Sequence, residues 1–416
     1  HRDLHSFPTR RSSDLGRRLQ KLSSATAALK PVHEHRISGK PFLRADSKAK
    51  VTGAAPFTAD VRLPGMLYAK ILRPPAHGAK RLFCDTQAAR AVPGVIVVEE
   101  PDMVAVLHEK PDVAEMARSL IVARFEEPAA AMDSETLFEE LLRQGTSSQT
   151  VLAKGDVARA RTDAAVVLES RYYNHYVAHA PMEPHAALVE IRDDKVNVWA
   201  STQSPFRVQD SVAQTLGLAR DKVHVRTPFV GGGFGGKTWA LQVTEAALLA
   251  KQTGRPVQVA WTREEEFFYD SFRPAAVLQV SAGVDRNGRI CFWRYDNYFA
   301  GARSSEPIYD IPHIEVSSRK QSNGPGPHPF NTGAWRGPGS NSNVFAMESH
   351  CDRLALLAGM DPLSFRLQNL SDERMKKVLL AAADRFGYSF TKSPSGQGIG
   401  IACTNYLNTY VATMAR

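Results

Sequence analysis

A glycine-rich segment holds the residues whose types and spacing point most directly to chemistry. Residues 231–238 are Gly-Gly-Gly-Phe-Gly-Gly-Lys-Thr, which satisfies the phosphate-loop pattern G-x-x-x-x-G-K-[ST]. The segment follows a predicted strand at 222–227 and opens a predicted helix at 241–253. In that context backbone N–H groups and the start of the helix bind an anion, and the lysine reaches further phosphate oxygens. One hypothesis is therefore a P-loop-type nucleotide-binding protein that uses Gly231–Thr238.

Two features of the sequence weigh against nucleotide binding. No later strand ends in the apolar run and aspartate that would hold a magnesium ion. Five glycines in the six positions 231–236 also exceed what a nucleotide loop needs. Since glycine has no side chain, this density favours a backbone that comes very close to a bulky group. A tight turn that binds nothing is the minority interpretation of so many glycines.

Other residues with reactive side chains have structural explanations. Three histidines lie within a short stretch but match no metal-ligand spacing, so we expect packing or supporting roles for them. They are His175, His179 and His185. The acidic triplet 264–266 follows Thr262 and is typical of the first turn of a capped helix. For Glu183 we expect an ion pair that holds its loop.

Composition and charge exclude several classes of protein. Hydrophobic residues make up 43% and charged residues 23% of the 416 residues, as in soluble globular domains. No apolar run reaches the roughly 18 residues that a membrane span needs. The formal charge is +9, but the basic residues are scattered without interleaved aromatics, which argues against a nucleic-acid partner. The four cysteines form no C-x-x-C pair, so we expect no zinc site, iron–sulfur cluster or disulfide framework.

The elements that must position the glycine loop indicate an α+β protein with more than one domain. A β-rich part at 41–72 is followed by strands at 95–98 and 103–107 and by helical periodicity at 112–125. Further along, the patterns predict strands at 164–168, 187–191, 195–200, 257–261, 276–282 and 290–299 and helices at 208–216, 241–253 and 343–359. Residues 285–288 are a predicted hairpin turn.

The two ends of the sequence have distinct features. Residues 1–15 contain a segment that looks like the translation of a sequencing-adapter oligonucleotide, so we exclude them from the fold. Residues 16–38 are a polar leader or linker. The last residues, 410–416, stop inside an apolar pattern without a cap or a glycine. We therefore expect both true termini to be missing.

The glycine loop and several other short segments resemble the motifs of a known protein family. Thr202-Gln203 and Gly231–Lys237, 27 residues apart, look like the paired active-site segments of molybdenum hydroxylases. Further matches include 179–184 (His-Ala-Pro-Met-Glu-Pro) and 333–337 (Gly-Ala-Trp-Arg-Gly). The sequence resembles the molybdopterin-binding large subunit of the xanthine dehydrogenase and aldehyde oxidase family, closest to its cytochrome-linked isoquinoline- and nicotinate-oxidising branch.

The resemblance implies a domain order and a cofactor site. Residues 39–130 would form an α/β hammerhead domain, 131–160 a connector, and 161–416 the first part of a mixed α/β molybdopterin-binding domain, truncated at its C-terminal end. The cofactor would be molybdenum–molybdopterin, with the cytosine dinucleotide form left open, and no protein side chain would ligate the metal. Its contacts would be Gln203, Gly232, Gly233, Phe234, Gly235, Gly236, Arg336 and Gly337. In this scheme backbone N–H groups of Phe234 and Gly235 point at the metal's oxygen ligands.

The resemblance also has departures and gaps. Thr238 stands where purine-oxidising relatives place a substrate-binding glutamate, and Pro338 replaces an aromatic residue that stacks on the substrate. Xanthine therefore fits this pocket less well than a smaller N-heterocycle or an aldehyde. The general-base glutamate of the family is expected beyond residue 416, so no catalytic residue is assigned within this fragment.

The same resemblance implies partners. Because no iron–sulfur or FAD site is expected in this chain, electrons would leave through a small [2Fe-2S] subunit, joined by either a cytochrome c or an FAD subunit. The compartment, bacterial cytoplasm or periplasm, stays open.

Overall fold

The computed structural model describes residues 28–129, 132–320, 327–390 and 396–416. The chain divides into two compact units, residues 1–55 and residues 56–416. In the first unit the described residues contain the short 3-10 helix η1 (Val32–Glu34) and the single-turn helix α1 (Ser47–Val51). The adapter-like residues 1–15 and the first part of the polar leader lie outside the described residues.

The second unit contains a seven-stranded mixed sheet with the strand order β10-β9-β8-β11-β1-β4-β3. In that order the strands are Val223–Arg226, Lys195–Ala200, Ala186–Arg192, Val257–Ala260, Leu67–Ile71, Met103–His108 and Ile96–Glu100. β10 pairs with β9 and β11 with β1 in parallel, and the other neighbours are antiparallel. Strands from 67–108 and from 186–260 therefore share one sheet. The predicted boundary between a domain at 39–130 and a domain at 161–416 stays a prediction.

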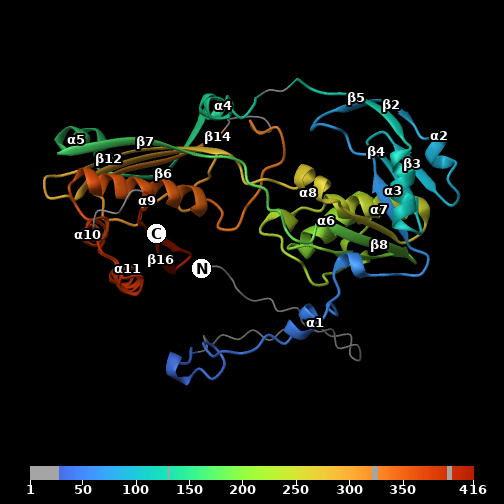
Figure 1. Cartoon of the computed structure of the whole chain (residues 1–416), viewed down its shortest axis with the longest axis horizontal. Coiled ribbons are helices and arrows are strands. Elements are labelled where there is room, and N and C mark those ends of the chain that lie inside the picture. Colours follow the sequence, from blue (N-terminus) through green and yellow to red (C-terminus); the bar gives the residue numbers. More distant parts are fainter. Residues whose placement is uncertain (1–27, 130–131, 321–326, 391–395) are drawn as a thin grey trace. The chain divides into compact units, whose positions relative to one another are not determined.

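Helices cover this sheet because their apolar faces need a partner. α6 (Pro205–Leu216) contacts β10, and α7 (Leu241–Thr253) contacts β8 and β11. α7 is rich in alanine and buried on several sides, and Figure 1 shows it beside α6 and β8. At the other end of the sheet, α3 (Pro111–Ser119) packs on β1 and β4. The two-stranded sheet of β2 (Lys80–Asp85) and β5 (Val122–Glu126) and the short helix α2 (Gln87–Arg90) complete this part.

A second, five-stranded sheet has the order β6-β14-β13-β12-β7. Its strands are Ser147–Lys154, His313–Lys320, Ile290–Tyr298, Ala276–Val284 and Val166–Asn174. β13 and β14 are parallel, and the other pairs are antiparallel. The long helix α9 (Ser340–Leu357) lies along β12 and β7, as Figure 1 shows. Trp293, Cys351 and Phe365 are fully buried in the core between them. α4 (Leu137–Gln144) contacts β12, and α5 (Val157–Asp163) contacts β13 and β14.

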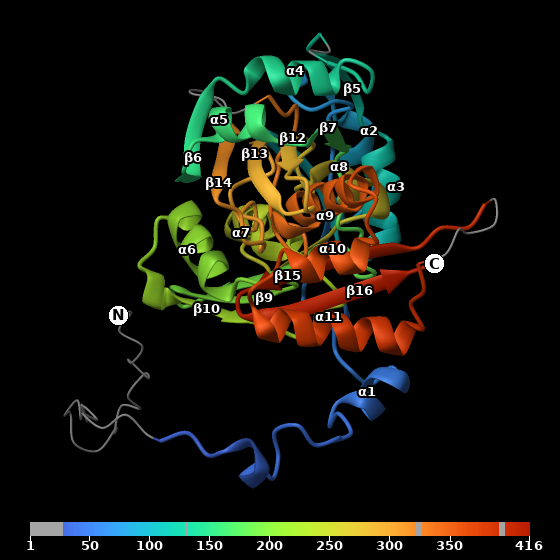
Figure 2. The same cartoon turned by 90° about the vertical axis from the view of Figure 1, so that its left-hand side faces the viewer.

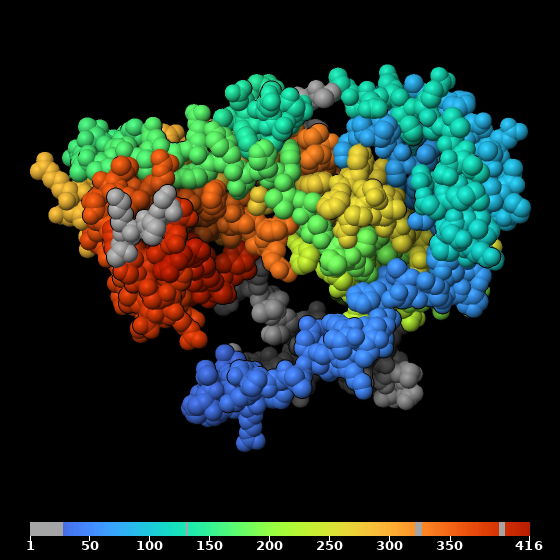
Figure 3. Space-filling model, viewed as in Figure 1, coloured from blue at the N-terminus to red at the C-terminus, as the bar shows by residue number. Residues whose placement is uncertain are grey.

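The last part of the chain packs on α9. α10 (Pro362–Gln368) contacts α9, and α11 (Glu373–Phe386) lies against the hairpin of β15 (Gly400–Tyr406) and β16 (Thr409–Ala415), as Figure 2 shows. In the space-filling view these red and orange segments form one continuous surface below the green β7 (Figure 3). The fully buried Arg366 joins them, since its guanidinium donates to Glu348 and to the Ile401 carbonyl oxygen.

The structure confirms the predicted α+β class and most of the predicted elements. The helix at 241–253 and the strand at 195–200 have the predicted limits, and β12 and β13 form the expected hairpin. Several predictions were wrong or incomplete. Residues 41–72, predicted to be β-rich, contain α1, the 3-10 helix η2 (Thr58–Asp60) and a single strand, β1. The helix predicted at 112–125 ends at Ser119, because Val122–Glu126 pairs as β5 with β2. β6 was not predicted, since its polar residues look like a connector until β14 supplies hydrogen-bond partners.

Within the described ranges, every helix is too short or too polar to cross a lipid bilayer.

Candidate cofactor site

The glycine loop connects β10 to α7 with an unusual backbone. Gly232 and Gly235 have φ values of 97° and 123°, and Phe234, which is not glycine, has a φ of 52°. The Gly236 N–H donates to the Gly233 carbonyl oxygen at 2.8 Å and closes a tight turn. A 3-10 turn, η4 (Gly236–Thr238), follows, and α7 begins only at Leu241. The sequence pattern predicted that the loop leads directly into the helix. In the structure η4 separates the two, so this prediction was wrong.

The glycines are needed because the loop touches four other parts of the chain. A Cβ atom at Gly231 would strike the side chain of Glu183, and one at Gly233 would strike the amide of Gln203. At Gly235 it would overlap the Ala334 carbonyl oxygen, and at Gly236 the Asp270 carboxylate. The close backbone approach that the sequence indicated is thus, at these four positions, an approach to protein atoms.

Lys237 points into the protein. Its side chain is fully buried, and its Nζ donates to Glu183 Oε2 at 2.8 Å. The same carboxylate oxygen accepts the Gly231 N–H at 2.8 Å. Burial lowers the pKa of Lys237, although the bond to Glu183 opposes this change. The structure confirms the ion pair expected for Glu183. Because Lys237 is buried in this pair, it is not available to bind phosphate as the P-loop hypothesis required.

Gln203 lies directly on the loop. Its Oε1 accepts the Gly235 N–H at 2.9 Å, and its own backbone N–H donates to the Lys237 carbonyl oxygen at 2.8 Å. The hydroxyl of Thr202 donates to the same carbonyl oxygen at 3.1 Å. The Gly235 N–H, which the family resemblance directs at the metal's oxygen ligands, is therefore bonded to Gln203 in this structure.

Three successive N–H groups of the loop have no acceptor among the described residues. No oxygen in those ranges accepts a hydrogen bond from the backbone N–H of Gly232, Gly233 or Phe234. Arg336 contacts the same loop, with its guanidinium 4.6 Å from the centre of the Phe234 ring. It is exposed, and no carboxylate within the described ranges pairs with it. Free N–H groups on a glycine backbone next to a free guanidinium are an arrangement that binds anions.

The predicted pocket residues, Thr238 and Pro338, do not line a common cavity. The hydroxyl of Thr238 donates to the Gly235 carbonyl oxygen at 2.8 Å. Pro338 lines a cavity of about 240 Å³ together with Arg273, Phe299 and Trp335, and Thr238 is not part of its wall. Gly337 has a φ of 74°, and its carbonyl oxygen accepts the Asn341 N–H near the start of α9.

His179 joins the loop to two other segments, a role that the sequence did not reveal. Its Nδ1 is 2.7 Å from Asp270 Oδ2, and its Nε2 is 2.8 Å from the Ala334 carbonyl oxygen. Both partners accept hydrogen bonds, so both ring nitrogens must carry protons, which makes His179 a buried imidazolium. Burial disfavours this charge, but the hydrogen bond to Asp270, the charge of Asp270 and the backbone hydrogen bonds together outweigh it and raise the pKa of His179.

A second buried pair supports the same region. His185 Nδ1 lies 3.0 Å from Glu266 Oε2, which also accepts the His185 backbone N–H at 2.7 Å. Glu266 belongs to α8 (Arg263–Tyr269), whose start is capped by a reciprocal pair between Thr262 and Glu265, as the acidic triplet predicted. Within the described ranges no group of three or more His, Cys, Asp or Glu side chains could hold a metal ion.

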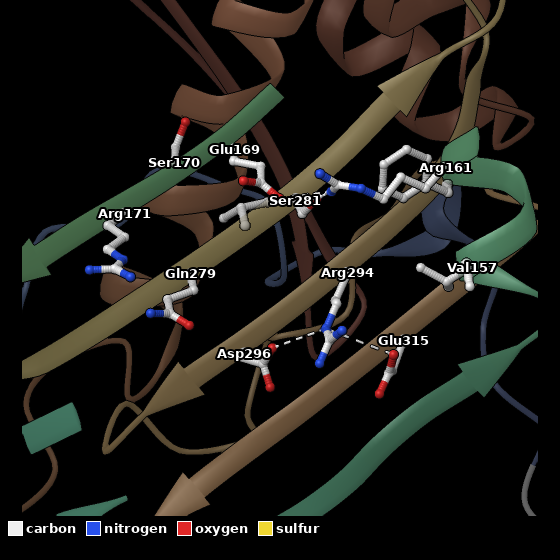
Figure 4. Close-up of a pocket in the computed structure, with 13 residues that line it drawn as sticks. Val157, Arg161, Glu169, Ser170, Arg171, Gln279, Ser281, Arg294, Asp296 and Glu315 are labelled. Carbon is white, nitrogen blue, oxygen red and sulfur yellow. Dashed lines mark hydrogen bonds and ion pairs between the residues drawn. The ribbon is translucent and has the colours of Figure 1, made fainter. Parts of the chain in front are cut away.

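A larger hollow lies elsewhere, on the open face of the five-stranded sheet. It has a volume of about 680 Å³, and Figure 4 shows charged side chains along its strands. Arg294 lies between Asp296 and Glu315, at 3.4 and 3.9 Å. None of the predicted site residues lines this hollow, and most of its charges are paired, Arg161 with Glu169 and Arg294 with Asp296 and Glu315, so we assign it no ligand.

Comparison with known proteins identifies the class of this chain. Residues 142–370, more than half of the sequence, match the family model of the molybdopterin cofactor-binding domain, and the chain belongs to this family. Two curated relatives are the beta subunit of isoquinoline 1-oxidoreductase from Brevundimonas diminuta and one of the subunits of nicotinate dehydrogenase from Pseudomonas putida. They are 30% and 27% identical over 94% and 86% of this chain. The match covers 54% and 33% of those proteins, so the chain spans between a third and about half of their length.

Solved structures share the fold. The aldehyde oxidoreductase from Desulfovibrio desulfuricans superposes with a TM-score of 0.75 at 20% identity, over 87% of this chain and 49% of that one. Quinoline 2-oxidoreductase from Pseudomonas putida 86 gives a TM-score of 0.72 at 22% identity, over 84% and 54%.

The buried ion pair of Lys237 generates a first prediction. In Lys237→Met the Glu183 carboxylate keeps its buried position without its cation, so we expect the free energy of unfolding to fall by about 3–5 kcal/mol. Urea unfolding followed by circular dichroism measures this loss. The double variant Lys237→Met/Glu183→Gln should regain most of it, and Lys222→Met, which breaks an exposed pair with Asp194, should change little. A Lys237→Met variant as stable as the wild type would contradict the prediction.

The charge of His179 generates a second prediction, with His350 as its matched control. Both side chains are buried, but His350 has no hydrogen-bond partner among the described residues, and burial lowers its pKa to about 3. We expect ¹⁵N NMR at pH 6.5 to show two protonated ring nitrogens for most of the His179 population and one for His350. Since its folded pKa is raised, His179 stabilises the fold fully below its ordinary pKa of 6.5. That stabilisation is lost as the pH rises through the raised value. A mostly neutral His179 ring at pH 6.5 disproves the assignment.

Proposed function

We propose that this site binds the molybdenum–molybdopterin cofactor and that the whole protein is a molybdenum hydroxylase subunit. The observation that carries the proposal is the row of N–H groups at Gly232, Gly233 and Phe234 on the loop that Arg336 contacts. In the described part of the chain these N–H groups have no acceptor, and Arg336 has no carboxylate partner. Molybdopterin is an anionic, oxygen-rich group, so these donors suit it. Membership of the molybdopterin cofactor-binding family supports the same assignment.

Each residue of the site has a proposed task. The loop N–H groups and Arg336 hold anionic oxygens. Gly236 lets the loop pack closely against Asp270, and Gly337 allows the positive φ of the segment that follows Arg336. Gln203 uses Oε1 to fix Gly235, which leaves its amide N–H₂ available to donate to an oxygen of the cofactor. The buried pairs of Lys237 and His179 keep these donors in place before the ligand arrives, which reduces the ordering cost of binding.

The bound cofactor supplies a two-electron redox centre for hydroxylation, in which a C–H carbon and water give a C–OH group, two electrons and two protons. Our proposal for the substrate is an N-heteroaromatic compound or an aldehyde, taken up near Thr238 and Pro338. The names of two similar proteins refer to such compounds: one is a nicotinate dehydrogenase subunit and the other an aldehyde oxidoreductase. The general-base glutamate is proposed to lie outside this sequence.

Electrons are proposed to leave through other subunits. A small [2Fe-2S] subunit would receive them, followed by a cytochrome c or FAD subunit. The relatives named as single subunits of larger enzymes support a multi-subunit assembly. For the pterin cofactor, the cytosine dinucleotide is one form that this proposal includes.

Molybdenum content tests the proposal. We expect about one molybdenum per chain, by elemental analysis, in protein expressed from the whole gene together with its neighbouring subunit genes. Arg336→Ala should weaken retention of the cofactor about tenfold or more, because it removes a charge-assisted contact.

The matched control is Arg374→Ala. Arg374 is also exposed and lies 4.7 Å from the Tyr410 ring centre, far along the chain from the loop. This variant should keep its molybdenum. Absence of molybdenum from the wild-type protein, combined with magnesium-dependent nucleotide binding, would overturn the proposal.

A further inference from the structure

β7 forms one edge of the five-stranded sheet, and within the described ranges its outer side has no strand partner. It pairs with β12 in an unbroken antiparallel register over all nine of its residues. α9 contacts β7 from one face of the sheet, whereas α4 and α5 contact inner strands. The backbone N–H and C=O groups that β7 directs outward are therefore open to another strand.

Other edges of the two large sheets carry features that discourage strand pairing. β6, at the far edge of the same sheet, has an irregular register with β14 between Val316 and Ser317. The edge strands of the seven-stranded sheet, β10 and β3, have only four and five residues. Bulges and short strands are the usual protection of an exposed edge. β7 is long and regular, and it contains no proline or glycine.

The side chains of β7 are complementary to those of a second, antiparallel β7. On the open face of the sheet the strand presents four exposed residues, Val167, Glu169, Arg171 and Tyr173. Antiparallel pairing of two copies about a two-fold axis at Ser170 places Val167 opposite Tyr173 and Glu169 opposite Arg171, and each pair occurs twice. Opposite charges and β-branched residues beside aromatic ones are the cross-strand pairs that stabilise antiparallel sheets.

The charges of β7 have free bonding capacity for such a partner. Arg171 has no carboxylate partner among the described residues, and Figure 4 shows it with Glu169 on β7. The Glu169 side chain is 64% exposed, and its Oε1 lies 2.7 Å from Arg161. Its Oε2 makes no hydrogen bond within the described ranges, so it can accept one from Arg171 of a second copy.

The same charges specify the register. Moving the two-fold axis from Ser170 to Glu169 or to Arg171 places that residue opposite its own copy, so that like charges meet. A shift of half a step would bring the open face of one sheet beside the α9 face of the other, because side chains alternate along a strand. Only the axis at Ser170 pairs the charges and keeps both open faces on the same side.

We propose that β7 pairs with β7 of a second copy of this chain, antiparallel and centred on Ser170, so that one sheet runs through both copies. The contact uses the same edge on both molecules and is complete with two copies. A second copy suits this edge because one sequence supplies both members of every pair. The predicted cofactor contacts lie outside β7, so the inference does not depend on the proposed function.

The number of copies per assembly tests the inference. Sedimentation equilibrium is measured on protein expressed from the whole gene together with its neighbouring subunit genes. We expect this chain to show a monomer–dimer equilibrium with a dissociation constant on the order of micromolar, because one pair of strands is a small interface. A single copy of this chain per assembly at roughly 100 times that concentration would overturn the inference.

Charge reversal tests the pairing itself. Glu169→Arg brings arginines opposite each other, and Arg171→Glu brings glutamates opposite each other. We expect each variant to raise the dissociation constant about 30-fold, because the unfavourable pair occurs twice by symmetry. The double variant Glu169→Arg/Arg171→Glu should dimerise like the wild type, and so should an equimolar mixture of the two single variants. A dimer that neither single variant weakens, or a loss that neither the double variant nor the mixture restores, would contradict the pairing.

Two further comparisons locate the contact. Glu315→Arg reverses an exposed charge on the same face, but β12 and β13 separate it from β7, so it should leave the dissociation constant unchanged. Ser170→Cys should give a disulfide-linked dimer on mild oxidation, since opposite residues of antiparallel strands have Cα atoms within the span of a disulfide. Ser281→Cys, on β12 beside Glu169, should not cross-link. Cross-linking through position 281 but not through position 170 would place the contact elsewhere and overturn the inference.

Discussion

The structure of the site depends on how closely the glycine loop packs against its neighbours. Four of its glycines leave no room for a side chain, and the obstacles are protein atoms of residues 183, 203, 270 and 334. Because one side of the loop is used for packing, the backbone is held in a conformation with positive φ at Gly232, Phe234 and Gly235. That conformation leaves three N–H groups without an acceptor in the described chain, and successive free N–H groups of this kind are what anion-binding loops in proteins present.

Buried charges keep the four segments in place. Lys237 with Glu183 and His179 with Asp270 each pair a buried cation with a carboxylate. Such pairs contribute little net stability, since removing two charges from water costs about as much as their attraction returns. Their contribution here is geometric, because a hydrogen-bonded charge tolerates few alternative positions. The loop, Gln203 and the segment that carries Arg336 thereby have fixed positions before any ligand binds.

The sequence predicted the parts of the site that depend on local pattern. The glycine density, the cap of α8 and the helix at 241–253 all follow from residues close together in the chain. The direction of Lys237 could not be predicted, because its partner is 54 residues away and a phosphate-loop pattern does not specify where the lysine points. Asp270 was missed for the same reason, since 91 residues separate it from His179.

The balance of charge around the loop favours an anionic ligand. The buried pairs cancel, whereas the guanidinium groups of Arg336 and Arg273, which lie over the rings of Phe234 and Trp335, have no carboxylate partner among the described residues. A carboxylate at position 238, directly after the loop, would oppose a bound anion, because Coulomb repulsion is strong where water is excluded. Threonine at this position keeps a polar group without that repulsion. Selection of a ligand beside the anion would then depend on hydrogen-bond matching rather than on charge.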